Sequence, residues 1–164
     1  MCGIVGYIGN GNAQEILLNG LHKLEYRGYD SAGIAVFRDH ELVVVKSHGR
    51  LAQLEEKLSG MSLDSRIGVG HTRWATHGEP NDANSHPHLS HNGKIAVVHN
   101  GIIENYARLK TFLEANGYEF RSETDTEVIA HLIEYHYRDD LMAALRATLQ
   151  DLEGAYALCV MCVD

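Results

Sequence analysis

The second residue of the chain is a cysteine that could become its N-terminus. Met1 precedes Cys2 directly. Removal of Met1 would leave Cys2 with a thiol and a free α-amine, whose pKa of about 7.7 to 8.0 suits a proton acceptor at neutral pH. Nucleophile and base would then share one residue, which is a known route to covalent catalysis. Taken alone, the residue is more typical of a small, inert core cysteine.

A second group of polar side chains follows an apolar segment at Ile67–Thr72. Arg73 could bind a carboxylate through two parallel hydrogen bonds, and it stands beside Trp74, the only tryptophan of the chain. The pair is a candidate clamp for a small acid. The alternative is a surface arginine stacked on a half-buried tryptophan.

Two further groups could complete an amide-hydrolysing site. Asn100 and Gly101 offer a side-chain amide and an accessible backbone N–H, the donors of an oxyanion hole, although Asn-Gly is also typical of turns. A carboxylate of the segment 122–127 could hold an ammonium group, although such a segment is more typical of a helix start capped by Thr124 or Asp125. Together with Cys2 and Arg73, these groups are what hydrolysis of a free amino acid's side-chain amide requires.

The histidines and the other cysteines are the alternative candidates for chemistry. None of the histidines has the two-turn helical spacing of a zinc helix, and histidines in a polar loop are typical of a protein surface. Cys159 and Cys162 on one strand would point to opposite faces, so we expect no shared metal ion there. No phosphate-binding glycine pattern is present. The histidines considered as metal ligands are those at 71, 77, 86, 88, 91 and 99.

Composition narrows the class of protein. The chain has 164 residues, 45% of them hydrophobic, and a net charge of -8. This length suits one domain with a core, and the acidic balance argues against a nucleic-acid partner. No apolar run is long enough to span a bilayer, and the start does not resemble a signal peptide. Three cysteines do not form a secreted disulfide framework, which predicts reduced thiols in the cytoplasm.

Apolar periodicity predicts the elements that must position these side chains. Strands and helices come in groups rather than in strict alternation, which predicts an α+β layered sandwich. The expected strands are Gly3–Gly9, Ala32–Phe37, Leu42–Lys46, Ile67–Thr72, Lys94–Val98 and one beginning at Ala155. The expected helices are Ala13–Leu24, Leu51–Leu58, Glu104–Ala115, Asp125–Tyr137 and Leu141–Leu149.

Five motifs together resemble one family. They occur in the family's order through the whole chain, and EYRGYDSAG with HTRWATHG is the most specific pair. The family is that of the glutaminase domain of glucosamine-6-phosphate synthases, the isomerizing glutamine–fructose-6-phosphate aminotransferases. The motifs are CGIVG at 2–6, EYRGYDSAG at 25–33, HTRWATHGEP at 71–80, HNGIIEN at 99–105 and SETDTEVIAHL at 122–132.

The resemblance implies a four-layer αββα fold of the N-terminal-nucleophile (Ntn) hydrolase type. Residues 1–164 would be one glutamine amidotransferase type 2 domain, stopping before its usual C-terminal end and without the sugar-isomerase domains. The implied substrate is L-glutamine, with no cofactor and no metal. In the family's full, homodimeric enzyme the isomerase region binds fructose 6-phosphate, which becomes glucosamine 6-phosphate in hexosamine biosynthesis.

Matching positions imply the catalytic roles. Cys2 would attack the γ-carboxamide of glutamine and form a γ-glutamyl thioester, with its own α-amine as base. Asn100 and Gly101 would stabilise the tetrahedral oxyanion. Arg27 would order the surroundings of the nucleophile.

The same resemblance implies the substrate-binding roles. Arg73, helped by Thr76 and His77, would bind the α-carboxylate of glutamine, and Asp125 would bind its ammonium group. Trp74 resembles the residue that gates the passage of ammonia.

Two other functions remain open at this stage. One is a cysteine Ntn acylase that acts on other amides, against which Arg73 and Asp125 argue. The other is a catalytically silent ligand- or metal-binding fragment, which only the histidine-rich loop and a retained Met1 would support.

Overall fold

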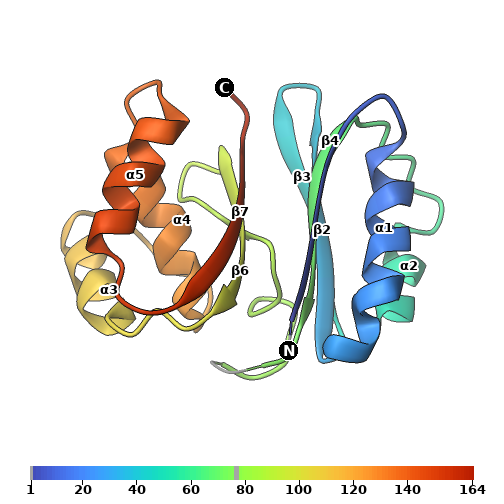
Figure 1. Ribbon diagram of the computed structural model, residues 1–164, viewed down its shortest axis with the longest axis horizontal. Helices are drawn as coiled ribbons and strands as arrows, with labels where there is room; N and C mark the ends of the chain where they lie inside the picture. Colours follow the sequence, from blue (N-terminus) through green and yellow to red (C-terminus); the bar gives the residue numbers. More distant parts are fainter. Residues whose placement is uncertain (1, 76–77) are drawn as a thin grey trace.

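A computed structural model describes residues 2–75 and 78–164. Two antiparallel sheets lie face to face, and helices cover the outer side of each sheet, so that the layers run α, β, β, α (Figure 1). The expected α+β sandwich with four layers is therefore confirmed. Within the described residues, no helix has the length and apolar character needed to cross a bilayer.

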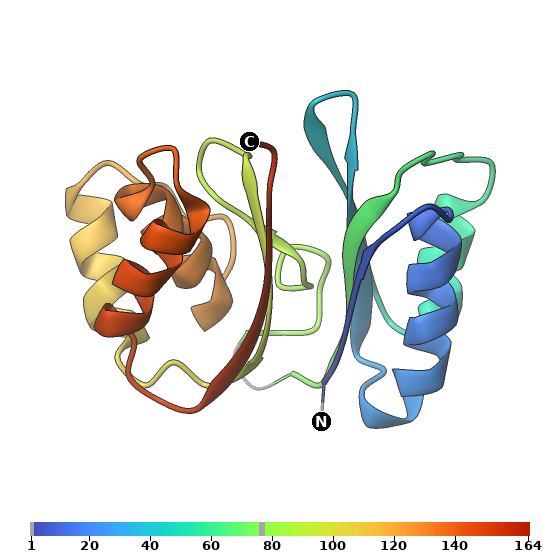
Figure 2. The ribbon, with the colours of Figure 1, turned by 45° about the horizontal axis from the view of Figure 1, so that its top comes forward.

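The first sheet has four strands and the second has three (Figure 2). In spatial order the first contains β1 (Gly3–Ile8), β4 (Ile67–Arg73), β2 (Ser31–Arg38) and β3 (Glu41–His48). The second contains β5 (His88–Leu89), β6 (Ile95–Gly101) and β7 (Tyr156–Cys162). The helices are α1 (Ala13–Leu24) and α2 (Leu51–Leu58) on the first sheet, and α3 (Tyr106–Ala115), α4 (Asp125–His136) and α5 (Leu141–Asp151) on the second. A short 3₁₀ helix, Glu25–Arg27, follows α1.

Three apolar clusters hold the layers together. Burial of apolar side chains stabilises such a domain by about 25 cal/mol per Å² removed from water. The cluster between the sheets draws on strands of both. Its buried members are Ala35, Val69, Ala96, Val98 and Met161.

Local signals explain where the outer helices begin. The Asn12 side chain accepts a hydrogen bond from Glu15 N–H at the start of α1, and Asp140 accepts one from Ala143 N–H at the start of α5. Each cap satisfies a backbone donor that the helix itself leaves unpaired. Leu17 and Leu21 then recur on the buried face of α1.

Strand register brings distant parts of the chain to one end of the sandwich. Gly3 of β1 pairs with Thr72 of β4, and Ser31 of β2 pairs with Arg73. The first residues of β1 and β2 therefore lie beside the last two residues of β4. In the facing sheet, β6 ends at Gly101.

The structure corrects some of the predicted element boundaries. The short strand β5 lies in a segment predicted as loop, and α3 begins at Tyr106 rather than at Glu104. Thr124 occupies the N-cap position of α4, but its side chain makes no capping bond. The opposite orientations of Cys159 and Cys162 are confirmed, because Cys159 packs between the sheets and Cys162 packs on the helical side.

Candidate active site

A cavity of about 380 Å³ opens at the end of the sandwich where these strands converge. Its wall combines residues from the two sheets, the 3₁₀ helix and the start of α4. It brings together Cys2, Arg73, Trp74, Asn100, Gly101, Asp125 and Arg27, seven of the nine residues that the sequence singled out. The other two, Thr76 and His77, lie outside the described residues.

Cys2 is half-buried and is fixed through both its sulfur and its backbone. Trp74 N–H donates to Cys2 Sγ at 3.0 Å, and Sγ lies 3.4 Å from Trp74 O. On the other side, Asn100 Nδ2 donates to the carbonyl oxygen of Cys2 at 3.1 Å. The candidate nucleophile is thus held between the end of β4 and the end of β6.

Gly101 supplies a backbone position beside the Asn100 amide that only glycine can occupy. Its φ is +120°, and a Cβ there would lie 2.2 Å from Ala155 O. Residues with a side chain rarely adopt this conformation. The last residue of β6 therefore lines the cavity with backbone alone.

Arg73 places a buried positive charge at the cavity. The residue is only 3% exposed. Burial lowers its pKa, and the opposing influence of Cys2, Asp30 and Asp125 favours the charged form. A guanidinium stays protonated even so. A planar, charged fork in a confined space suits a carboxylate ligand.

Asp125 is the first residue of α4 and is only 4% exposed. Its Oδ2 accepts the backbone N–H of Ile103 at 2.8 Å. Asp125 also lines the cavity, where its other oxygen could accept a hydrogen bond from a bound ammonium group.

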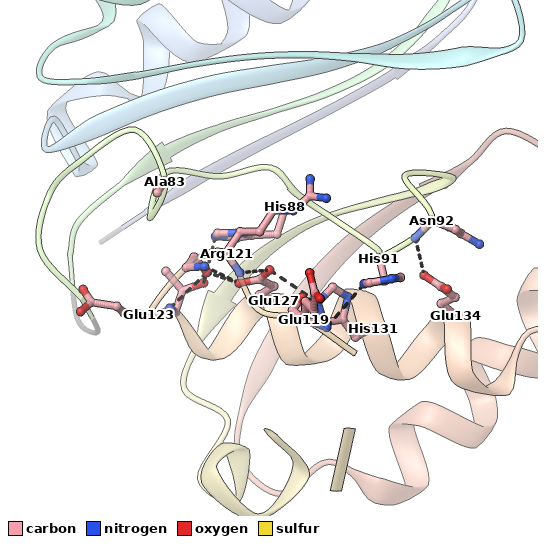
Figure 3. Close-up of polar contacts among 12 residues, drawn as sticks. Ala83, His88, His91, Asn92, Glu119, Arg121, Glu123, Glu127, His131 and Glu134 are labelled. Carbon is pink, nitrogen blue, oxygen red and sulfur yellow. Dashed lines mark hydrogen bonds and ion pairs between the residues drawn. The ribbon is translucent and has the colours of Figure 1, made fainter. Parts of the chain in front are cut away.

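Glu127 anchors the segment that presents Asp125 (Figure 3). The N–H groups of Arg121 and Ser122 donate to its two oxygens at 2.8 and 2.7 Å, and His131 lies 3.5 Å from Oε1. Burial alone would raise the pKa of Glu127, but bonds from His131, Ser122 and Arg121 outweigh it and lower the pKa to about 2. The carboxylate thus fastens the chain before α4 to the helix itself.

Trp74 and Arg27 complete the wall. Trp74 is 47% exposed and meets the ring of Tyr29 edge-on, with centroids 5.8 Å apart. The guanidinium of Arg50 lies over the Tyr29 ring, 5.2 Å from its centroid. Arg27 lines the cavity directly.

The loop histidines, expected at the surface, are partly in the core. His86 and His88 are buried, and His86 stacks on the buried His71 with centroids 4.1 Å apart. Gly33 makes room, because a Cβ at that position would lie 2.1 Å from His86 O. Hydroxyl groups of the α4 region bind these rings, for example Thr124 Oγ1 and His88 Nε2 at 2.9 Å. In 2–75 and 78–164, no group of three or more His, Cys, Asp or Glu side chains could hold a metal ion.

Sequence reasoning missed two residues that support the site. Asp30 accepts the N–H of Ala75, and His71 contacts Asn100. Both stand inside motifs that the sequence analysis quoted, EYRGYDSAG and HTRWATHGEP. Their presence there was a signal, but nothing in the sequence indicated what each side chain touches.

The comparisons with known proteins match this geometry. Residues 71–163 fit the family described as "Glutamine amidotransferase domain". The chain belongs to this family. A glutamine–fructose-6-phosphate aminotransferase [isomerizing] from Caldanaerobacter subterraneus subsp. tengcongensis is 60% identical over the whole chain, and one from Aquifex aeolicus is 55% identical over 99% of it. The chain spans 27% and 28% of the lengths of these two relatives.

Solved glutamine amidotransferases share the fold. The glutamine phosphoribosylpyrophosphate amidotransferase of B. subtilis superposes with a TM-score of 0.85 at 31% identity, over 99% of this chain and 35% of its own. This likeness confirms the Ntn hydrolase fold expected from the motifs.

Proposed function

We propose that this glutamine amidotransferase domain hydrolyses L-glutamine to glutamate and ammonia through a thioester on Cys2. One observation carries the proposal: Cys2 Sγ and the Asn100 amide share a cavity with a buried arginine and a buried aspartate. A nucleophile beside an oxyanion donor suits acyl transfer. Opposite charges in the same cavity select an amide that carries both a carboxylate and an ammonium group.

The reaction begins once Met1 has been removed. The α-amine of Cys2 takes the thiol proton as Sγ bonds to the carbonyl carbon of the γ-carboxamide of glutamine. Asn100 Nδ2 and the Gly101 N–H stabilise the oxyanion of the tetrahedral intermediate. The C–N bond then breaks, the amine returns the proton to the leaving ammonia, and water hydrolyses the remaining thioester.

Substrate recognition falls to the charged residues around the nucleophile. Arg73 binds the α-carboxylate, with Thr76 and His77 of the neighbouring segment as further ligands. Asp125 binds the ammonium group through Oδ1. Trp74 lines the cavity, its ring is half-exposed, and it gates the passage of ammonia. Such a gate also keeps water away from the reacting groups. Arg27 orders the wall next to Cys2.

We further propose a place for this domain in a longer enzyme. Residues 1–164 act as the glutaminase part of a homodimeric glutamine–fructose-6-phosphate aminotransferase. Ammonia released at Cys2 aminates fructose 6-phosphate, which a sugar-isomerase part of that enzyme binds, to give glucosamine 6-phosphate. The similarity to two such enzymes over nearly the whole chain supports this assignment. The three cysteines are free, as the cytoplasm would keep them.

The first test is the intact mass after exposure to an electrophilic glutamine analogue. The expected spectrum shows a protein that lacks Met1 and carries one adduct, and an excess of glutamine prevents the adduct. Cys2→Ala is the control and should remain unlabelled. Met-free protein that takes up no adduct and releases no ammonia from glutamine would contradict the proposal.

A second test separates the glutaminase from an acylase of broader specificity. A glutaminase should leave simple amides without an α-carboxylate, such as butyramide, almost unhydrolysed. Equal kcat/KM for butyramide and glutamine would favour the acylase.

A further inference from the structure

The imidazole of His71 connects the two sheets next to the nucleophile. His71 belongs to β4 of the first sheet and is only 1% exposed. Its Nε2 lies 2.9 Å from Asn100 Oδ1 and 3.1 Å from His99 O, both on β6 of the facing sheet.

The contact with His99 O determines where the His71 ring carries its proton. A backbone carbonyl only accepts hydrogen bonds, so Nε2 must donate. Burial lowers the pKa of His71 to about 4, so the ring is neutral at physiological pH. A neutral imidazole carries one proton, which leaves Nδ1 bare, and Nδ1 has no hydrogen-bond partner among the described residues. The stacked ring of His86 holds the imidazole in this plane.

The protonation of His71 in turn determines which end of the Asn100 amide faces Cys2. The shared Nε2 proton requires an acceptor, which is Asn100 Oδ1. The amide nitrogen therefore points away from His71. One of its two protons binds Cys2 O at 3.1 Å, and the second is left to face the cavity.

We propose that His71 is a positioning residue that locks the Asn100 amide with its nitrogen toward the oxyanion of the reaction. The proposal rests on the proposed glutaminase function. His71 transfers no proton and does not touch the substrate. It acts through Asn100, and because it spans the gap between the sheets it also fixes the distance from Cys2 to the oxyanion donor.

Two substitutions at this position test the proposal. His71→Leu removes the donor and frees the amide to rotate, so kcat for glutamine should fall about 10- to 100-fold, approaching the loss of an oxyanion donor. KM should change less than about threefold, because the substrate's charged groups bind elsewhere. His71→Gln retains an N–H donor and should recover most of kcat, with the pH profile of the wild type.

His136 provides the control for loss of an imidazole that bonds a second element. Its Nε2 lies 2.7 Å from Asp151 Oδ2, a contact between α4 and α5 on the helical side of the second sheet. His136→Leu should lower the unfolding temperature while kcat stays within about twofold of the wild type. Equal losses of kcat in His71→Leu and His136→Leu would overturn the proposal, as would a dependence of kcat on pH in His71→Gln that differs from that of the wild type.

A measurement on the unmodified chain covers the case in which His71→Leu does not fold. Nitrogen-15 NMR of the wild type should show the His71 proton on Nε2 from pH 5 to pH 8, and a proton on Nδ1 would overturn the proposal. This result does not depend on turnover. Failure of the wild type to hydrolyse glutamine would contradict the proposed function, whereas full activity in His71→Leu would contradict only the role of His71.

Discussion

Asp30 binds the chain on both sides of Trp74. Its carboxylate accepts Ala75 N–H at 2.8 Å, and its own N–H donates to Arg73 O at 3.1 Å. Asp30 therefore extends the contact between the motifs EYRGYDSAG and HTRWATHGEP beyond the paired strands β2 and β4. Because the Trp74 N–H in turn donates to Cys2 Sγ, Asp30 supports the backbone on which the nucleophile rests.

Loss of the Asp30 carboxylate should impair glutamine binding more than it lowers the stability of the fold. In Asp30→Ala, we expect KM for glutamine to rise about 10-fold and the free energy of unfolding to fall by about 1 to 2 kcal/mol, as for one lost charge-assisted hydrogen bond. Steady-state ammonia release and urea unfolding measure the two effects. Asp64→Ala, at an exposed loop position, is the control and should change neither. An unchanged KM in Asp30→Ala would contradict the supporting role.

Substitution of Arg73 tests carboxylate recognition without removing charge. Arg73→Lys keeps a cation but loses the planar fork, so KM for glutamine should rise about 10- to 100-fold. The slow hydrolysis of butyramide, which has no carboxylate, should hardly change. Initial rates with both amides provide the comparison, and equal losses on both would argue that Arg73 only supports the cavity wall.

Removal of the oxyanion donor should slow the reaction but leave the nucleophile intact. Asn100→Ala should lower kcat about 100- to 1000-fold with little change in KM. Alkylation of Cys2 by iodoacetamide forms no oxyanion and should proceed as in the wild type. A matching loss of alkylation would show instead that the substitution displaces Cys2.

Alanine substitutions at two glycines of the first sheet should differ in how much they destabilise the fold. A Cβ at Gly33 would meet His86 O at 2.1 Å, whereas a Cβ at Gly6 would meet Cys159 Sγ, an adjustable side chain, at 3.1 Å. Gly33→Ala should expel the loop from between the sheets and cost more than about 2 kcal/mol, within the range for overpacked cores. Gly6→Ala should cost less than half as much. Urea unfolding of both variants measures the difference.

Acid should remove the contribution of Glu127 to stability. Hydrogen bonds hold its pKa near 2, below the value of 4.5 for a free glutamate, so the folded chain binds the carboxylate form more strongly. This stabilisation, roughly 3 kcal/mol, is complete above pH 4.5 and is lost as the pH falls toward 2. Glu127→Gln should therefore be less stable at pH 7, and the gap should narrow at pH 3. A constant gap would contradict the assignment.

The sequence predicted most of the elements because their signals are local. Leu17 and Leu21 recur at helical spacing, and the β-branched run before Lys46 indicates a strand wherever it lies. The strand β5 was not predicted, because a strand of two residues shows no periodicity. Residue types also singled out Cys2 as a candidate nucleophile, Asn100 as a candidate oxyanion donor and Arg73 as a candidate carboxylate ligand. The resemblance to the family added Asp125.

Only the tertiary structure decided how these groups support one another. His86 and His88 are buried because Gly33, far away in the sequence, leaves space for their loop. The bond from His71 to Asn100 joins two sheets across 29 positions of the chain, and Asp30 reaches Ala75 across 45. A sequence pattern carries information about residues that are close to one another along the chain. It does not record which side chains the packing of two sheets brings within 3 Å, and here that packing positions the amide, the thiol and the arginine together.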